Sequence, residues 1–254
     1  MRIRLLPAAF PGRTPVPYLT SFVVDDVLAI DAGSLGLADD EALQNGLRDV
    51  FLSHTHADHT ATLPIFVETA HLVGGRPVRV HAAASTLDCL RRDVFNDRVW
   101  PDLERIQNPD RPFMELATFN DEEAVVVGRH RVIPIRVNHT IDCSGFVIDD
   151  GASSVLISSD TAPTERIWEV ARRLDRLKAV FIEASFPNDA EPLAVMTGHL
   201  TPALLVRELE KVGRRIDVFA YHLKPRYHAT LERELREAGG TRVVVADPRE
   251  VYVL

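Results

Sequence analysis

Cysteine is scarce in this chain of 254 residues, which contains only Cys89 and Cys143. Two cysteines can form one disulfide bond at most, so a small scaffold held together by disulfides is excluded. We expect both thiols to be reduced and the protein to be cytoplasmic. Long apolar runs are missing too: none reaches the ~18 residues that a membrane span requires. Pro7 and Pro11 also interrupt the apolar N-terminal segment too early for a signal peptide.

The chain also lacks an excess of basic residues. The chain has 29 Lys and Arg against 37 Asp and Glu, which gives a formal net charge of −8. Proteins that follow a nucleic acid usually carry a basic surface, so we expect no extended nucleic-acid partner. A small anion is still a possible substrate, because a bound metal ion supplies local positive charge. Apolar residues make up 46% and charged residues 26% of the chain, which is typical of a folded globular protein.

Short apolar runs predict β-strands, with helices between the later ones. The runs 21–24 and 27–31 flank an acidic pair and predict a hairpin. Further strands are predicted at 49–53, 78–81, 124–127, 132–137, 144–149, 155–159, 179–183, 217–221 and 242–246. Helices are predicted at 60–73, at 165–174 capped by Thr164, from a Thr201 cap to about 212, and at 225–238. We expect mixed sheets covered by helices in one domain over 1–254, with an insertion around 91–123 over one face.

The densest chemical signal is the segment Ser-His-Thr-His-Ala-Asp-His at 53–59. Neutral imidazole and carboxylate together suit Zn²⁺ or a similar divalent ion. Directly after a strand, the alternating spacing aims His54 and His56 to one side. Asp58 and His59 follow in the turn and can reach a second ion. A solvated polar loop is the alternative for a single histidine, but this density of ligand-type residues favours a metal site.

This His-x-His-x-Asp-His pattern resembles the metallo-β-lactamase superfamily. The resemblance implies an α+β fold, an αββα four-layer sandwich of two mixed sheets with a metal site at one sheet edge. It also implies two divalent ions that share a hydroxide, most simply Zn²⁺, with Mn²⁺ and Fe²⁺ also permitted. Asp58 counts both as a ligand and as a catalytic residue. The implied ligands are His54, His56 and His139 for one ion, Asp58, His59 and His222 for the other, and Asp160 as the bridge.

Two later segments resemble the phosphodiesterase branch of the superfamily, which includes the tRNA 3′-end-processing endonuclease. They are Ile182-Glu183-Ala184-Ser185 and the run Gly-His-Leu-Thr-Pro at 198–202. The resemblance implies that His199 is the general acid and that Glu183 orients it. Breaking a phosphate ester releases an alkoxide, and a positioned imidazolium is suited to that proton transfer. The alternative is that His199 merely occupies a helix N-terminus.

The resemblance is closer still to the class II cyclic nucleotide phosphodiesterases. Its most discriminating piece is Phe-Asn-Asp-Arg-Val-Trp-Pro-Asp at 95–102, which lies away from the metal motif. It implies hydrolysis of a small-molecule 3′,5′-cyclic nucleotide, with cAMP as the first candidate, to the nucleoside 5′-monophosphate. Asn96 and Trp100 are then candidates for binding the base and ribose, although Trp100 can equally be a core residue. One departure is Ala57, where the family usually has Leu, and the segment 60–70 departs too.

Three alternatives stay open. An RNA 3′-end-processing phosphodiesterase of the same superfamily shares His199 and Glu183, but the net charge disfavours it. The second alternative is a lactonase or β-lactamase, in which His199 and Glu183 would have no assigned function. The third alternative is a protein that binds a nucleotide without turnover. A homodimer is the default expectation for the oligomeric state.

Three further residues near the motifs have two interpretations each. Asp31 lies at a strand end before the histidine motif, and it either orients a ligand histidine or is an ordinary turn residue. Lys224 and Arg226 follow His222 and either meet a phosphate or begin the last helix at the surface.

Overall fold

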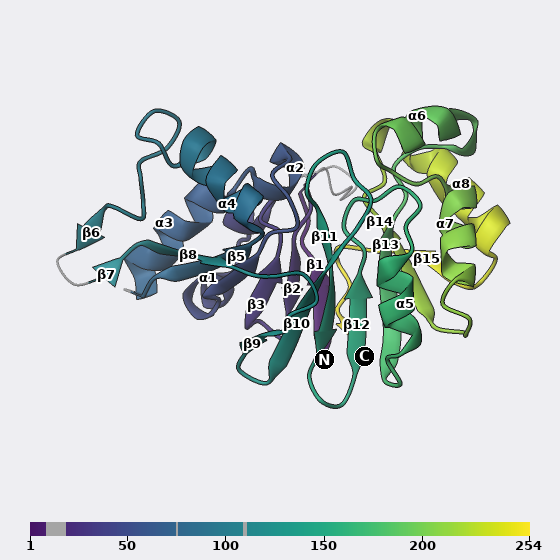
Figure 1. The fold of residues 1–254 in the computed structure, drawn as a ribbon, viewed down its shortest axis with the longest axis horizontal. Coiled ribbons are helices and arrows are strands. Elements are labelled where there is room, and N and C mark those ends of the chain that lie inside the picture. Colours follow the sequence, from purple (N-terminus) through teal and green to yellow (C-terminus); the bar gives the residue numbers. More distant parts are fainter. Residues whose placement is uncertain (9–18, 75, 109–110) are drawn as a thin grey trace.

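Two seven-stranded β-sheets lie face to face in the computed structural model of the protein, which describes residues 1–8, 19–74, 76–108 and 111–254 (Figure 1). In each sheet three neighbouring pairs are antiparallel and the remaining three pairs are parallel. The parallel strands are joined by crossovers that carry helices, as parallel pairing requires. This arrangement brings the carboxyl ends of several strands to the same edge of the sandwich.

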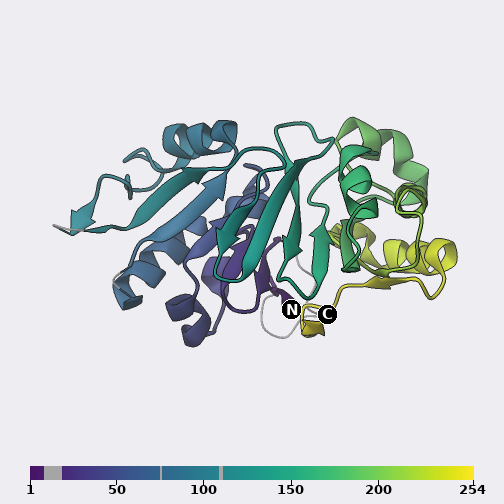
Figure 2. The same cartoon turned by 60° about the horizontal axis from the view of Figure 1, so that its bottom comes forward.

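The first sheet comes from the N-terminal half of the chain and the extreme C-terminus. Its strands in spatial order are β16 (Tyr252–Val253), β1 (Arg2–Leu5), β2 (Phe22–Val24), β3 (Leu28–Ile30), β4 (Asp49–Phe51), β5 (Val78–Ala82) and β8 (Met114–Thr118). Strand β16 pairs with β1, so the two termini lie side by side (Figure 2).

The second sheet comes from the C-terminal half. Its strands in spatial order are β15 (Val243–Val245), β14 (Asp217–Tyr221), β13 (Leu177–Glu183), β12 (Ser154–Ile157), β11 (Ser144–Asp149), β10 (His130–Arg136) and β9 (Val125–Val127). A separate two-stranded hairpin, β6 (Gln107–Asn108) with β7 (Arg111–Pro112), extends away from both sheets in Figure 1.

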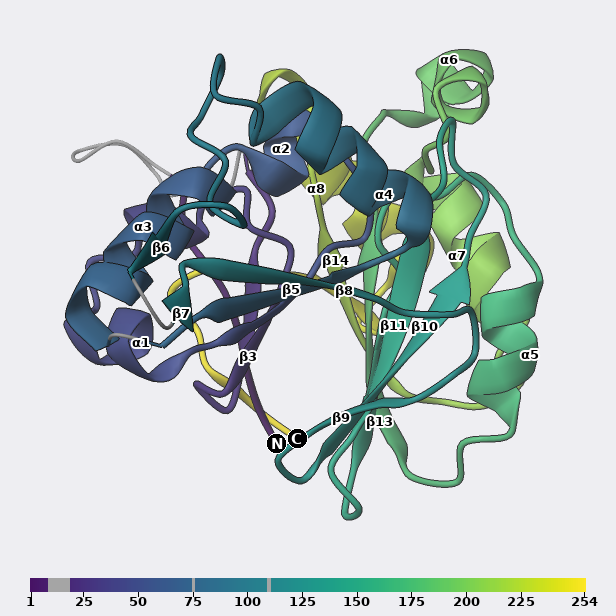
Figure 3. The same ribbon diagram turned by 60° about the vertical axis from the view of Figure 1, so that its left-hand side comes forward.

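Helices cover the outer face of each sheet, so the predicted αββα sandwich is confirmed (Figure 3). Helices α1 (Glu41–Gly46) and α3 (Leu63–Gly74) cover the first sheet. Helices α5 (Arg166–Arg172), α7 (Pro202–Glu210) and α8 (His228–Gly239) cover the second. Three more helices are α2 (Ala57–Thr60), α4 (Ala84–Cys89) and α6 (Glu191–Met196). No helix in the described ranges is long and apolar enough to cross a membrane.

Aromatic side chains fill the space between the two sheets. Phe22 of β2 packs edge to face against Phe181 of β13 and Tyr221 of β14, with ring centroids 5.3 and 4.9 Å apart. Phe51 of β4 meets Phe146 of β11 in the same manner at 6.2 Å. Such pairs bury large apolar surfaces, and their preferred edge-to-face angle favours one relative position of the two rings. The sheets are therefore packed against each other directly beside the edge where the histidine motif lies.

The predicted strands of both sheets are observed, and the differences have local causes. The helix predicted at 60–73 is split into α2 and α3, because the Thr62 hydroxyl accepts from Gly36 N at 2.8 Å and donates to Ala32 O at 2.9 Å. Thr201 caps α7 as predicted. The Thr164 cap is wrong, because α5 begins at Arg166 without a side-chain cap.

The expected insertion at 91–123 is in part a regular piece of the sandwich. Its residues 114–118 form β8, which pairs in parallel with β5 at the edge of the first sheet. Only the first residue of this edge strand is fully buried, and its mixture of apolar and polar residues hid it from the sequence pattern. Residues 109 and 110 of the expected insertion lie outside the described residues. Strands β1 and β16 were not predicted either.

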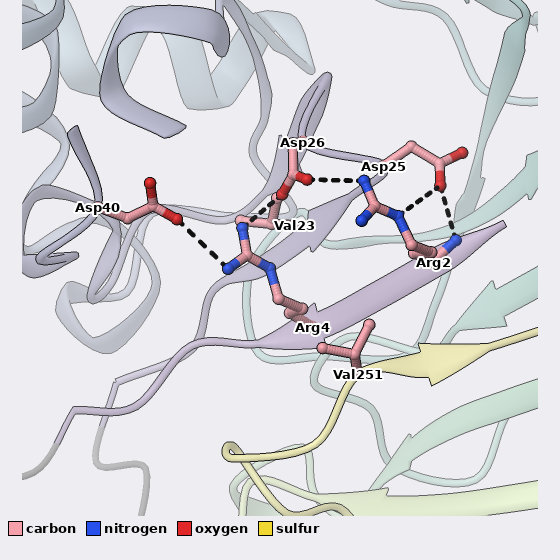
Figure 4. Close-up of a pocket in the computed structure, with 7 residues that line it drawn as sticks. All are labelled: Arg2, Arg4, Val23, Asp25, Asp26, Asp40 and Val251. Atoms are coloured by element: carbon pink, nitrogen blue, oxygen red, sulfur yellow. Dashed lines mark hydrogen bonds and ion pairs between the residues drawn. The ribbon is translucent and has the colours of Figure 1, made fainter. Parts of the chain in front are cut away.

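A row of alternating charges lies at the end of the first sheet opposite the carboxyl ends of its parallel strands (Figure 4). The turn between β2 and β3 carries Asp25 and Asp26, and both have positive φ, 48° and 58°. Arg2 donates to Asp26 at 2.8 Å, and Arg4 is bonded to Asp26 and lies 3.5 Å from Asp40. The pocket between them, of about 150 Å³, therefore offers guanidinium groups that carboxylates already neutralise.

Asp25 joins the two sheets at this end. Its carboxylate accepts from Arg2 N at 2.7 Å in the first sheet, from His130 Nε2 at 2.8 Å in the second, and from Arg129 at 2.8 Å. Burial raises the pKa of the Asp25 carboxyl, but these hydrogen bonds lower it more, so that the pKa is about 2. A carboxyl whose pKa is lowered by folding stabilises the fold at pH values above the pKa that it has in the unfolded chain. This stabilisation is lost as the pH falls toward the pKa of the folded state.

We predict that Asp25→Asn lowers the free energy of unfolding at pH 7, because the neutral amide loses the charge that strengthens these hydrogen bonds. The loss should be roughly 1 kcal/mol, since solvent screens this partly exposed group. The difference from wild type should stay constant above pH 5 and shrink as the pH falls below 4, when the unfolded chain becomes protonated. Urea denaturation at a series of pH values measures it. The exposed Asp175→Asn variant is the control, and a difference that persists unchanged down to pH 3 contradicts the role given to Asp25.

Candidate metal centre and active site

The chemistry-bearing residues lie on loops at one edge of the sandwich. The histidine motif follows β4, Asp160 follows β12, and His222 follows β14, while Glu183 is the last residue of β13. His139 comes from the loop between β10 and β11. In sheets of this kind the carboxyl ends of parallel strands are the usual position of a ligand site. Each sheet therefore contributes part of one common site.

The backbone turns sharply through the left-handed region just after three strands, β3, β12 and β14. Asp31, Ser159 and His222 have φ of 61°, 55° and 61°. Such a conformation costs of order 1–3 kcal/mol for a residue other than glycine and persists only where its surroundings hold it. Gly198 has φ 76°, and a Cβ there would lie 2.5 Å from His139 Nδ1. The backbone around the site is therefore held in conformations that place particular side chains.

The first cluster contains His54, His56, His139 and Asp160, each with one ligand-type atom within 4.8 Å of the others. His139 Nε2 lies 3.1 Å from His56 Nδ1, and His54 Nε2 lies 3.8 Å from Asp160 Oδ2. His54 and Asp160 are almost completely buried. Four such groups around one point match the donor set that Zn²⁺ and related ions prefer.

The second cluster contains Asp58, His59, His222 and the same Asp160. His222 Nε2 lies 3.1 Å from Asp58 Oδ2 and 3.6 Å from Asp160 Oδ1. His59 Nε2 lies 3.3 Å from Asp160 Oδ2. Asp160 Oδ2 faces His54 of the first cluster and His59 of the second, while Oδ1 faces His222, so this carboxylate belongs to both clusters.

Several buried atoms in these clusters have no hydrogen-bond partner among the described residues. They are His54 Nε2, His59 Nε2 and Asp160 Oδ1. A buried polar atom without a partner costs roughly 1–3 kcal/mol, so native proteins avoid it. Three of them directed at a common space are explained if a cation binds there. The residues therefore fit a divalent metal ion.

The other ring nitrogen of four histidines is already engaged, which assigns their tautomers. The Nδ1 of His59 donates to Asp31 Oδ2 at 2.7 Å, and that of His54 to Ser53 Oγ at 2.9 Å. The same atom of His139 donates to Gly198 O, and that of His222 to Ser185 Oγ, both at 2.8 Å. Each ring thereby presents its Nε2 lone pair to the cluster, which is how ligand histidines are generally oriented.

The pKa shifts in the site follow from burial and from the charges packed together there. Burial lowers the pKa of His54 and His56, and neighbouring imidazoles lower it further. Burial raises the pKa of Asp160, but the imidazoles around it outweigh that effect and hold the pKa well below the usual range. Burial lowers the pKa of His59, and the carboxylates of Asp160 and Asp31 raise it well above the usual value. Metal ligands must be deprotonated, so a bound cation takes the place of that proton.

A third group, Glu183 with His199 and His222, adjoins the second cluster. His199 Nδ1 donates to Glu183 Oε1 at 2.8 Å, and Ser185 donates to Glu183 Oε2 at 2.9 Å. Thr161 N donates to the same carboxylate at 3.2 Å. Burial lowers the pKa of His199, but Glu183 raises it more, so the pKa is above its ordinary value.

The structure brings together all seven predicted ligands and the predicted acid pair. The two predicted base-binding residues make other contacts. Asn96 uses its side chain within its own loop: it accepts from Arg98 N and Val99 N and donates to Arg92 O. Trp100 packs against the core of the first sheet. Their role in binding substrate stays a prediction.

Sequence reasoning missed the serines that orient the histidines. Ser53 precedes the motif and donates to Asp31 while it accepts from His54. Ser185 lies between Glu183 and His222 and contacts both. Its position two residues after Glu183 was a usable signal, because alternate residues of an extended segment face the same side. Asp31 contacts a histidine of the motif, as one of its two interpretations required.

The sequence matches a known protein family over more than half of its length. The family model described as cAMP phosphodiesterases class-II matches residues 37–219. The chain belongs to this family. A curated relative from Saccharomyces cerevisiae, "3′,5′-cyclic-nucleotide phosphodiesterase 1", is 24% identical over 193 residues, which are 66% of this chain and 51% of the relative. The chain thus spans about half the length of the curated relative that it matches.

Solved structures show the same fold. The metallo-β-lactamase fold protein YhfI from Bacillus subtilis superposes with a TM-score of 0.77 at 17% identity, covering 99% of this chain and 98% of that one. Unliganded yeast PDE1 superposes with a TM-score of 0.75 at 19% identity, covering 96% and 97%. The protein has the metallo-β-lactamase fold, as the motif implied.

We predict that Asp31→Asn weakens the affinity for divalent metal about 10- to 100-fold, the usual effect of losing the partner of a ligand histidine. The amide keeps an acceptor for Ser53 N but places N–H groups where His59 Nδ1–H needs an acceptor. Competition with a chromogenic chelator measures the affinity. The exposed Asp39→Asn variant should bind like wild type. Equal affinity in the Asp31 variant shows that Asp31 does not orient His59.

Proposed function

We propose that the protein hydrolyses a 3′,5′-cyclic nucleotide, with cAMP as the first candidate, to the nucleoside 5′-monophosphate. The observation that carries the proposal is the position of the Glu183–His199 pair. This pair forms a group with His222 of the second cluster, and His199 Nδ1 lies 3.9 Å from Asp160 Oδ2, which belongs to both clusters. A proton donor and a site for cations therefore lie side by side, which is what cleavage of a phosphodiester requires. Membership of the class II family supports cyclic nucleotides as the substrate class.

The proposed cofactor is a pair of divalent ions. Zn²⁺ is the first candidate because histidine dominates the donor set, and Mn²⁺ and Fe²⁺ suit the same ligands. When bound, such a pair lowers the pKa of a water molecule and neutralises charge on the phosphate. Asp160 would contribute to both positions. One ion would be held by His54, His56 and His139, and the other by Asp58, His59 and His222.

His199 would act as the general acid. Its Nδ1–H is held by Glu183, so the proton that leaves is the one on Nε2. The carboxylate of Glu183 raises the pKa of His199 against the effect of burial, which favours the protonated ring. Donation of the Nε2 proton to the departing 3′-oxygen avoids release of a free alkoxide. Glu183 stabilises the imidazolium before the transfer and keeps the ring from turning away.

Turnover of cAMP by the metal-loaded protein tests the proposal, with bis(p-nitrophenyl) phosphate in parallel and elemental analysis of the same sample. We expect release of 5′-AMP, two ions per chain, and loss of turnover after chelation. Cleavage of the aryl diester without cleavage of cAMP would overturn cAMP as substrate. A tRNA precursor cleaved faster than any cyclic nucleotide would favour the RNA-processing alternative.

We predict that His199→Ala retains its metal but loses turnover of cAMP by about 100-fold or more, the usual contribution of a general acid. The loss on bis(p-nitrophenyl) phosphate should be much smaller, because p-nitrophenolate is a good leaving group that needs no proton. Rates on both substrates and metal content by elemental analysis measure the effect. Equal losses on the two substrates count against proton donation by His199.

A further inference from the structure

Lys224 carries an ammonium group near His199 that the proposed chemistry does not use. Its Nζ lies 5.4 Å from the centroid of the Phe186 ring. Phe186 in turn packs against His199, with ring centroids 5.7 Å apart. The Lys224 charge is near enough to His199 to lower the pKa of that ring, against the larger raising effect of Glu183. Lys224 thus lies on the side of the site where the proton donor is.

The backbone directs this side chain toward the site. His222 turns the chain with φ 61°, and the next residue, Leu223, is buried in the core of the second sheet. After this turn the Lys224 side chain extends toward Phe186, whose ring centroid lies 5.4 Å from Nζ. Pro225 follows and restricts Lys224 to an extended conformation, which is observed with φ −63° and ψ 128°. The Lys-Pro pair therefore fixes where the lysine leaves the chain.

An aromatic ring rather than a carboxylate holds the ammonium group. Within the described part of the chain, Lys224 takes part in no ion pair, whereas Lys211 pairs with both Glu165 and Glu208 at 2.7 Å. A cation–π contact positions a cation without cancelling its charge. Phe186 therefore leaves Lys224 available to an anion that enters the site. The neighbouring Arg226 is exposed and points to no partner in the same residues.

We propose that Lys224 binds the anionic phosphodiester group of the substrate and, with Phe186, makes the site selective for negatively charged esters. This inference rests on the proposed function for the identity of the substrate, but it concerns a contact that any phosphodiester or phosphomonoester can make. Lysine binds phosphate as a compact point charge with three donors. A lysine beside the proton donor holds the phosphate while the leaving oxygen lies toward His199.

The test compares Lys224→Gln, Lys224→Arg and the control Arg226→Gln in the metal-loaded protein. Hydrogen bonds to charged groups contribute roughly 1.5–3 kcal/mol, so Lys224→Gln should raise KM for bis(p-nitrophenyl) phosphate and cAMP about 10-fold or more. Its kcat should change much less, and its metal content should not change. Lys224→Arg, which keeps the charge, should recover most of the KM effect. Arg226→Gln should behave like wild type.

A binding measurement keeps the two proposals separate. Calorimetric titration of the metal-loaded variants with 5′-AMP should show about 10-fold weaker binding in Lys224→Gln and unchanged binding in Arg226→Gln. If wild type cleaves only the aryl diester, the cAMP proposal fails while Lys224 is still tested by that substrate and by 5′-AMP. Unchanged KM and unchanged 5′-AMP affinity in Lys224→Gln overturn the inference, as does an equal loss in Arg226→Gln.

Discussion

The buried carboxylate of Asp160 is the group on which the arrangement of the site depends. It comes from the second sheet, yet it faces His54 and His59 from the first. Burying a carboxylate is costly unless positive charge or hydrogen bonds surround it. One of its oxygens has no hydrogen-bond partner among the described residues. The two halves of the sandwich therefore meet at a carboxylate whose free oxygen is suited to bind a cation.

A layer of partners behind the ligands turns this edge of the sandwich into a directed site. Asp31 and Ser53 act on the motif from the first sheet, and Ser185 and Glu183 act from the second. Each fixes one ring nitrogen so that the other faces the common space. Ser185 contacts His222 as well as Glu183, so the group that would donate a proton and a group that would hold metal share one hydrogen-bond network.

The sequence predicted the ligand residues because their positions follow from simple rules. The resemblance to the superfamily implied a later His, an Asp and a last His in that order, and the ends of apolar runs showed where His139, Asp160 and His222 meet that order. Orienting contacts such as Ser53 with Asp31 depend on the packing of separate strands, which no local pattern encodes. The break between α2 and α3 was missed for the same reason, since Thr62 bonds to residues about 26 and 30 positions away. Strand β8 was missed because an edge strand lacks a fully apolar pattern.

The peptide group of Gly198 contacts a predicted metal ligand and directly precedes the predicted general acid. Its carbonyl oxygen receives the Nδ1 proton of His139, and the residue that follows it is His199. Only glycine fits at this point, because a Cβ would collide with the His139 ring. One planar amide therefore accepts a hydrogen bond from a predicted metal ligand at its oxygen and carries the predicted acid on its nitrogen side. The spacing between these two side chains is set by a single peptide unit with no side chain of its own, so a residue with a Cβ at this position would disturb both.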